Sequence, residues 1–247
     1  MEYRLSEDYG ETFGGFNTVP YTKKVLLDGL YSAIIETAVV CNDGSIVAFC
    51  NIFSQKNEVC CYPFAKPAYI RSVDNGKTWG DAHQLSDFEG RIYSSRYHDG
   101  KIYVLEFCNK DVVGEKADDL YRIFTSDDNG KSFRELCVVP FRSTKGRFYG
   151  AMQFAPDGDM IVYAYNRECE EELDYAISSD CGKTWYKTGV CYLSKKIRNP
   201  QVNVLDGQFI LHGREAGEIN AFVLYTSADG ITWDEGNRIA DRRPGTS

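Results

Sequence analysis

The segment Ser72-Val73-Asp74-Asn75-Gly76-Lys77-Thr78-Trp79 decides the fold, because the chain repeats its pattern five times. The other copies begin at Ser6, Ser126, Ser178 and Ser227, and the last of them lacks one residue before its glycine. The first serines of successive copies lie 66, 54, 52 and 49 residues apart. Such even spacing is typical of proteins built from repeated structural units.

Each copy has the composition of a tight turn. Its serine and aspartate, two residues apart, can accept hydrogen bonds from backbone N–H groups of the turn that follows. Its glycine supplies a positive φ angle, and a threonine or serine plus an aromatic then resume an extended strand. We therefore expect every copy to be a hairpin turn between two strands, with its last aromatic buried as an anchor between units.

A second hairpin signal recurs between the copies. Stretches rich in β-branched and aromatic residues flank an Asp-Gly pair at 43–44, 99–100, 157–158 and 206–207. Asp-Gly between apolar strands is the strongest short-range hairpin signal. No segment shows a helical period, so we expect no helix. Together the two kinds of turn predict an all-β chain of repeated four-stranded antiparallel units.

The repeated phrase, S-x-D-x-G-x-[TS]-[WF], resembles the Asp-box, or BNR repeat, of sialidases and related β-propellers, and the resemblance covers nearly the whole chain. It implies an all-β propeller in which these turns lie on the outside, far from the active site. We expect a single domain over residues 1–247, with a partial first blade and about five blades in all. The C-terminal end is expected to be truncated, and a section of a six-bladed propeller is favoured over a five-bladed ring with an incomplete blade.

Composition narrows the possible partners. The net charge of −8 gives no electrostatic support for a nucleic-acid partner. No apolar run approaches the ~18–20 residues of a membrane span. The nine cysteines include no CxxC spacing, so we expect no metal site, and no cofactor is implied. Because the N-terminal residues lead into a strand without a signal peptide, a cytoplasmic location is expected; removal of an upstream leader would make it extracellular.

Aligning the Asp-Gly turns shows which residues lie where the innermost strand of each blade begins and where the second strand ends. In propellers these points share one face, over the central axis, which we call the mouth. The strand entries carry Glu36, Ile92-Tyr93, Arg147 with Tyr149, and Arg198-Asn199, and the strand ends carry Asn51, Glu106, Asn166 to Glu168, and Arg214-Glu215. Charged groups in a narrow ring need partners or a ligand, so this clustering indicates a polar site.

The resemblance to sialidases assigns roles to some of these residues. In that family three arginines bind the sugar carboxylate, and a tyrosine assisted by a glutamate is the nucleophile. The implied ligand-binding residues are Arg167, Arg198 and Arg214, together with Asn166, and the implied catalytic residues are Glu36 and Tyr149. Tyr149 could instead be a wall aromatic, and Arg198, Arg214 and Glu36 could serve only structural pairs. Arginine suits the first role because its guanidinium grips a carboxylate with two parallel hydrogen bonds.

The sequence also departs from the family's pattern. It lacks the Phe/Tyr-Arg-Ile-Pro segment that supplies the first arginine, and no aspartate can be assigned as the acid. Glu36 and Arg167 lie in different blades, whereas the corresponding family residues share one.

Three functions therefore remain open at this point. The favoured one is a sialidase-like glycoside hydrolase acting on terminal acidic sugars of glycans, or a segment of one. The second is a non-catalytic propeller that binds a glycan or protein, with its arginines diverging or paired internally. The third is a two-carboxylate glycosidase of another Asp-box family, with Glu36, Glu106, Glu168 and Glu215 as candidate acids.

Overall fold

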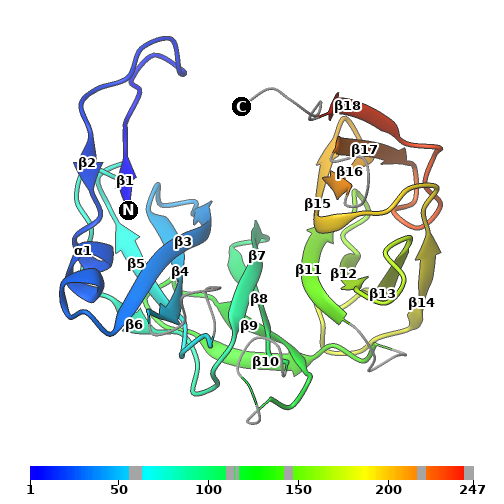
Figure 1. Cartoon of the computed structure of the whole chain (residues 1–247), viewed down its shortest axis with the longest axis horizontal. Coiled ribbons are helices and arrows are strands. Elements are labelled where there is room, and N and C mark those ends of the chain that lie inside the picture. Colours follow the sequence, from blue (N-terminus) through cyan, green and yellow to red (C-terminus); the bar gives the residue numbers. More distant parts are fainter. Residues whose placement is uncertain (56–62, 110–113, 115–116, 142–146, 216–220, 242–247) are drawn as a thin grey trace. The chain divides into compact units, whose positions relative to one another are not determined.

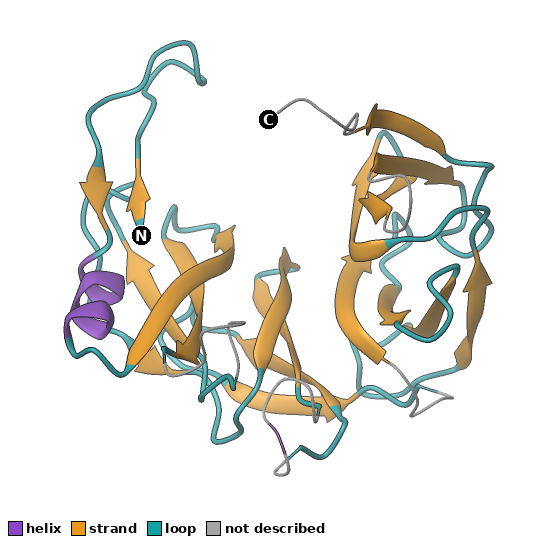
Figure 2. Ribbon diagram, in the orientation of Figure 1, coloured by secondary structure: helices purple, strands orange, loops and turns teal. Residues whose placement is uncertain are grey.

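The computed structural model describes residues 1–55, 63–109, 114, 117–141, 147–215 and 221–241. It divides into two compact units, Met1–Glu135 and Leu136–Ser247. Both units are built from antiparallel four-stranded sheets, which we call blades (Figures 1 and 2).

The first unit begins with a two-stranded sheet and a helix, which precede its two blades. The strands of the small sheet are β1 (Glu2–Tyr3) and β2 (Asn17–Thr18), and the helix is α1 (Pro20–Leu27). The first blade has the order β3 (Tyr31–Val40), β4 (Ile46–Ser54), β5 (Ala68–Ser72) and β6 (His83–Gln84). The second has the order β7 (Arg91–His98), β8 (Lys101–Phe107), β9 (Tyr121–Ser126) and β10 (Arg134–Val138), and the unit boundary falls within β10.

The second unit contains two further blades of the same plan. One has the order β11 (Arg147–Phe154), β12 (Met160–Asn166), β13 (Glu172–Ser178) and β14 (Lys187–Tyr192). The other has the order β15 (Arg198–Leu205), β16 (Gln208–Glu215), β17 (Ala221–Ser227) and β18 (Asn237–Asp241).

The expected all-β fold with four-stranded antiparallel blades is thus confirmed. The number of blades differs slightly from the expectation of about five, because the described residues form four complete blades. The first copy of the repeated phrase lies between β1 and β2, whose sheet has two strands.

All five copies form the expected turn, each between the last two strands of its sheet. In the second copy the backbone N–H of Gly76 donates to Ser72 Oγ at 2.9 Å, and the N–H of Thr78 donates to Asp74 Oδ1 at 2.8 Å. The hydroxyl of Thr78 donates to the other oxygen of Asp74 at 2.6 Å. Equivalent bonds recur in the copies that begin at Ser6, Ser126, Ser178 and Ser227. The serine and aspartate therefore satisfy backbone donors that the turn leaves unpaired.

The aromatic that ends each copy is half-buried in four of the five turns. Phe133 contacts the rings of Phe49 and Tyr69 in the preceding blade, at centroid distances of 5.6 and 4.7 Å. Phe13, in the first copy, is 52% exposed and differs from the expected buried anchor. The aromatics of later copies pack against the preceding sheet, as Trp79 does on Tyr3, and among the described residues no sheet precedes the first copy.

A buried core lies between the two blades of the first unit. Val47 and Phe49 of β4 pack against Ile102 and Val104 of β8, and all four are fully buried. Alternate residues of each strand thus face the neighbouring blade, as the period of two requires.

The helix α1 corrects the expectation that no helix would form. Pro20 is at its first turn, where a missing N–H costs nothing and the fixed φ favours helix. Val19, just before it, is fully buried, and Thr22 is buried as well, so tertiary packing stabilises a short segment with no side-chain N-cap and weak amphipathicity. No helix among the described residues is long and apolar enough to cross a membrane.

Candidate functional site

Every innermost strand has a register shift, which lies near the beginning of β7, β11 and β15 and in the middle of β3. The shifts fall between Ile35 and Thr37 in β3, Ile92 and Ser94 in β7, Arg147 and Gly150 in β11, and Arg198 and Gln201 in β15. A bulge of this kind leaves residues outside the ladder and re-aims their side chains. The residues aligned from sequence as equivalent strand entries, Glu36, Tyr93 and Tyr149 among them, therefore occupy equivalent bulges.

In the first unit, Glu36 is held by two side chains. Its Oε2 accepts hydrogen bonds from Asn51 Nδ2 at 2.8 Å and from Arg91 at 3.1 Å. Asn51 is fixed in turn, because it exchanges two hydrogen bonds with the backbone N–H and C=O of Ile92. The side chain of Glu36 is 22% exposed, so this carboxylate is oriented yet still accessible.

The guanidinium of Arg91 also lies over two aromatic rings. Its Cζ is 4.7 Å from the ring centre of Tyr93 and 5.2 Å from that of Phe64. Cation–π contact and the ion pair with Glu36 together confine this arginine. Glu36, Asn51 and Arg91 thus form a preorganised charged cluster on the first unit.

In the second unit, Arg198 forms an ion pair with Glu170. Its Nε donates to Glu170 Oε1 at 2.5 Å, and the buried Tyr165 donates its phenolic hydrogen to the same oxygen at 2.6 Å. Burial alone would raise the pKa of Glu170, but these two donors hold it below its usual value. Burial and the neighbouring Glu170 carboxylate raise the pKa of Tyr165, so this phenol stays protonated.

Arg214 lies beside Arg198, because the two are directly paired residues of β15 and β16. It is exposed and makes no ion pair with any residue in the described part of the chain. The next residue, Glu215, is instead bound to Arg238 by two hydrogen bonds of 2.6 and 2.8 Å. Of these three arginines, Arg214 is therefore the one without a carboxylate partner among the described residues.

The remaining predicted residues of this unit lie around the ends of β11 and β12. Arg167 is exposed, with its Cζ 6.0 Å from the ring centre of Phe148. Tyr149 is half-buried, and its ring packs against Phe148 and Tyr165 at 4.7 and 5.8 Å. A row of ring contacts through Phe148 and Tyr149 thus connects Arg167 with Tyr165.

Asn166 shapes the loop that follows β12. Its Oδ1 accepts hydrogen bonds from the N–H of Glu168 at 3.0 Å and of Cys169 at 3.3 Å. Its Nδ2 donates to Glu172 at 3.4 Å. These local bonds give Asn166 a loop-forming role that exists without any ligand.

Glu106, a candidate acid from the sequence, is buried in the first unit. Glu106 lies directly opposite Arg122 in the ladder of β8 and β9. The guanidinium of Arg122, however, binds Asp118. Both oxygens of Glu106 lack a hydrogen bond of good geometry to the described residues, with the Ser86 hydroxyl nearby. Burial raises the pKa of Glu106 to about 8, so this carboxyl is mostly neutral at pH 7.

Sequence reasoning missed Glu170 and Arg91, which hold the predicted residues Arg198 and Glu36. Glu170 lies in the acidic run 170–172, where nothing in the sequence distinguishes the buried member. Arg91 immediately precedes the strand entry at Ile92, so widening each entry by one residue could have found it. Among the described residues, no three His, Cys, Asp or Glu side chains are grouped closely enough to hold a metal ion.

Comparison by sequence finds no relatives: no family model matches the chain, and no curated protein matches it. Comparison of structures does find similar folds. The NanB sialidase from Streptococcus pneumoniae is 15% identical, with a TM-score of 0.62, over 84% of this chain and 52% of that one. The Trypanosoma rangeli sialidase is 19% identical, with a TM-score of 0.58, over 94% of this chain and 40% of that one.

A third similar structure has a different activity in its name. It is an alpha-L-arabinofuranosidase from Clostridium thermocellum, 14% identical with a TM-score of 0.59, over 85% of this chain and 72% of that one. This chain spans about half the length of the two sialidases. At these identities the likeness concerns the fold. The chain is therefore an all-β protein with blades of the β-propeller type found in sialidases and other β-propeller glycosidases.

Proposed function

We propose that the chain is a sialidase-like glycoside hydrolase acting on terminal acidic sugars of glycans, or a segment of one. The observation that carries this proposal is the adjacent pair Arg198 and Arg214 at the ends of β15 and β16. Arg214 is exposed and without an ion pair among the described residues, so its guanidinium is available to a sugar carboxylate. The structural likeness to two sialidases supports the same class of substrate.

In this proposal Arg167, Arg198 and Arg214 bind the carboxylate, and Asn166 positions the loop that carries Arg167. Glu36 and Tyr149 are the proposed catalytic residues, and the five repeated turns are Asp-boxes of the sialidase type. The cluster of Glu36, Asn51 and Arg91 supports a role for Glu36, because its carboxylate is already oriented without a ligand.

The test is release of 4-methylumbelliferone from its sialic-acid glycoside. Wild type is expected to turn the substrate over, and Arg214→Ala and Arg167→Ala each to lose about a hundredfold in kcat/KM, since a charged hydrogen bond to the substrate is removed. Arg134→Ala is the matched control, because Arg134 is an exposed arginine on the outer strand β10, paired with Asp127 at 3.2 Å. Absence of turnover by folded wild type would reject the hydrolase proposal.

A second candidate is a non-catalytic propeller that binds an acidic glycan. It is favoured by the ion pairs that Arg198 and Arg238 make with Glu170 and Glu215, since arginines engaged internally are less available for catalysis. In that case sialylated oligosaccharide would bind the wild type without being cleaved, and Arg214→Ala would weaken the binding. Calorimetric titration together with product analysis separates the two candidates.

The two-carboxylate alternative has less support from the geometry. Glu106 is neutral enough at pH 7 to act as an acid, but it is only 1% exposed. Glu215 is committed to Arg238. Glu168 is exposed, and Glu36 is already paired with Arg91.

A further inference from the structure

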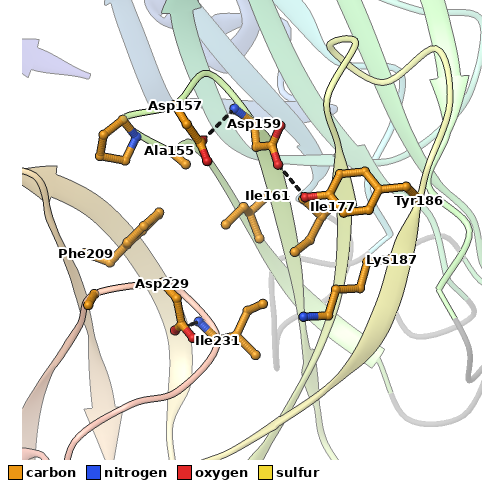
Figure 3. A pocket seen from close by; sticks show the side chains of 12 residues that line it. Ala155, Asp157, Asp159, Ile161, Ile177, Tyr186, Lys187, Phe209, Asp229 and Ile231 are labelled. Carbon is orange, nitrogen blue, oxygen red and sulfur yellow. Dashed lines mark hydrogen bonds between the residues drawn. The ribbon is translucent and has the colours of Figure 1, made fainter.

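A pocket of about 410 Å³ lies in the second unit at the end of the blades opposite to the candidate site (Figure 3). It is bounded by the β11–β12 hairpin on one side and by the fifth repeated turn on the other. Tyr149 lies in β11 and Ala155 directly follows its end, six residues later, which separates the pocket from the candidate site by roughly 20 Å. We call it the turn-end pocket, and nothing in the proposed function uses it.

The inner wall of the turn-end pocket is apolar and rigid. Ile161 of β12, Ile177 of β13 and Phe209 of β16 contribute to it, and each is at most 4% exposed. These side chains stand on paired strands, so the wall is formed before any ligand arrives. The volume is within the range of small-molecule sites.

The rim of the pocket is negatively charged. Asp157 and Asp159 lie on one side of the apolar wall and Asp229 on the other, while Lys187 is the cation among the lining residues (Figure 3). Three carboxylates against one ammonium leave an excess of negative charge around the opening. The ammonium of Lys187 also lies 5.8 Å from the ring centre of Tyr175, outside the lining set.

Two of these carboxylates retain an oxygen that could bind a ligand. One oxygen of Asp157 accepts the N–H of Asp159 at 3.1 Å, and one oxygen of Asp159 accepts the phenol of Tyr186. The other oxygen of each accepts no hydrogen bond from any described residue. Asp229 is different, because both of its oxygens are engaged by the fifth turn. The open acceptors therefore lie on the side of the β11–β12 hairpin.

Tyr186 donates its phenolic hydrogen to Asp159 at the rim of the pocket. That hydrogen bond, together with burial and the charge of Asp159, raises the pKa of Tyr186 to about 12. A phenol with so high a pKa remains the donor in this bond at neutral pH. The rim thus presents charge beside an apolar wall.

We propose that the turn-end pocket binds an organic cation carried on a hydrocarbon chain, namely an arginine side chain of a peptide partner. The guanidinium pairs with the open oxygens of Asp157 and Asp159, and the methylene groups lie against Ile161, Ile177 and Phe209. Anionic ligands are repelled by the same rim. This binding is independent of the proposed hydrolase activity, since it uses the other end of the blades.

The experiment uses N-acetyl-arginine methyl ester as the probe and isoleucine-methyl-labelled protein. Three isoleucines, Ile161, Ile177 and Ile231, line the pocket, so their methyl resonances are expected to shift on titration. Ile70 and Ile102, buried in the first unit, are expected to stay in place. A probe of this size is expected to bind with a Kd of ~0.1–1 mM. N-acetyl-citrulline methyl ester is the neutral control and is expected to bind at least about tenfold more weakly, having lost the charge.

Variants identify the carboxylates that are responsible. Asp157→Asn and Asp159→Asn are each expected to weaken the probe about five- to tenfold, because a charge-assisted pair becomes a neutral hydrogen bond. Asp206→Asn is the matched control, since Asp206 occupies the corresponding hairpin turn between β15 and β16 and does not line the pocket. The asparagine at 157 can still accept the N–H of Asp159, and unchanged methyl resonances elsewhere verify folding. Equal binding of the arginine and citrulline probes, no shift of the three methyls, or equal loss in the control variant would each overturn the proposal.

Discussion

The phenol of Tyr163 donates a 2.8 Å hydrogen bond to the carbonyl oxygen of Gly230, joining β12 of one blade to the repeated turn of the next. The same relationship occurs twice in the first unit, where Tyr3 donates to Gly76 at 2.7 Å and Tyr69 to Lys131 at 3.2 Å. Burial raises the pKa of Tyr163 well above its usual value, so the phenol remains a donor at any ordinary pH. A tyrosine of each of these sheets therefore satisfies a backbone carbonyl of the following turn.

Removing this hydroxyl should destabilise the second unit. Tyr163→Phe leaves the Gly230 carbonyl without its donor in a buried place, and we expect a loss of about 1–2 kcal/mol in the free energy of unfolding. Tyr175→Phe is the control, because Tyr175 is also buried in this unit and its hydroxyl bonds no described residue. Urea unfolding of both variants should show the larger loss for Tyr163→Phe. Equal losses would mean that the bond contributes nothing specific.

The glycines of the turns allow a second comparison. Gly130 has a φ of +77° and a Cβ added there would lie 2.4 Å from Cγ2 of Val47, whereas Gly100 has a φ of +75° with open space around it. Alanine at either position destabilises the fold by about 1 kcal/mol, because it must adopt the left-handed backbone conformation. Only Gly130→Ala also places its Cβ against the neighbouring blade. We expect Gly130→Ala to lose a further ~1–3 kcal/mol from overpacking. Thermal unfolding of the two variants measures this difference, and equal midpoints would contradict it.

The aspartates of the turns should make the protein sensitive to acid. Burial alone would raise the pKa of Asp128, but hydrogen bonds from Ser132 and Ser126 lower it to about 2. A folded pKa below the unfolded value gives stability that is complete above pH ~4 and is lost as the pH falls towards 2. Because Asp128 is only half-buried and water screens its charge, this turn contributes about 1 kcal/mol at most. Asp128→Asn should therefore show a shallower fall in melting temperature between pH 5 and pH 2, and an unchanged slope would refute the linkage.

Glu106 should produce the opposite dependence at higher pH. Burial raises the pKa of Glu106 to about 8, above the unfolded value of ~4.3. The stability that Glu106 contributes to the fold is therefore complete below pH ~4 and is lost as the pH rises to 8. We expect the free energy of unfolding of the wild type to fall by on the order of 3 kcal/mol between pH 5 and pH 8.5 because of this group. Glu106→Gln should not show this fall. The comparison is between the slopes of wild type and variant, since the new amide also changes the stability at every pH. Parallel curves would show that Glu106 does not titrate in this range.

The repeated phrase was sufficient to predict the blades because its hydrogen bonds are local. Ser72, Asp74 and Thr78 satisfy one another within seven residues, so their spacing in sequence specifies their geometry. The Asp-Gly turns also predicted where β7, β11 and β15 begin, whereas β3 begins at Tyr31, before the expected entry at Glu36. The bulge in each inner strand falls at the aligned residues.

The partners of the candidate site could not be predicted in the same way. Glu170 and Arg198 are 28 residues apart, and their pairing depends on how two neighbouring blades pack. The turn-end pocket likewise combines residues from two blades, and its apolar wall has the same alternating pattern as any buried strand. The helix α1 was not predicted, because it depends on tertiary contacts that bury Val19 and Thr22 and leave no pattern in the local sequence.

The bulge in every inner strand has an evolutionary consequence. Residues in a bulge are excluded from the ladder, so Glu36 or Tyr149 can be exchanged with little effect on the strand pairing beyond it. The ladders resume at Thr37 and Gly150 and hold the blade framework independently of what the bulge presents. Substitutions in a bulge can thus alter the presented surface while the strand ladder stays intact, which makes this architecture a modular scaffold on which new specificities can evolve one position at a time.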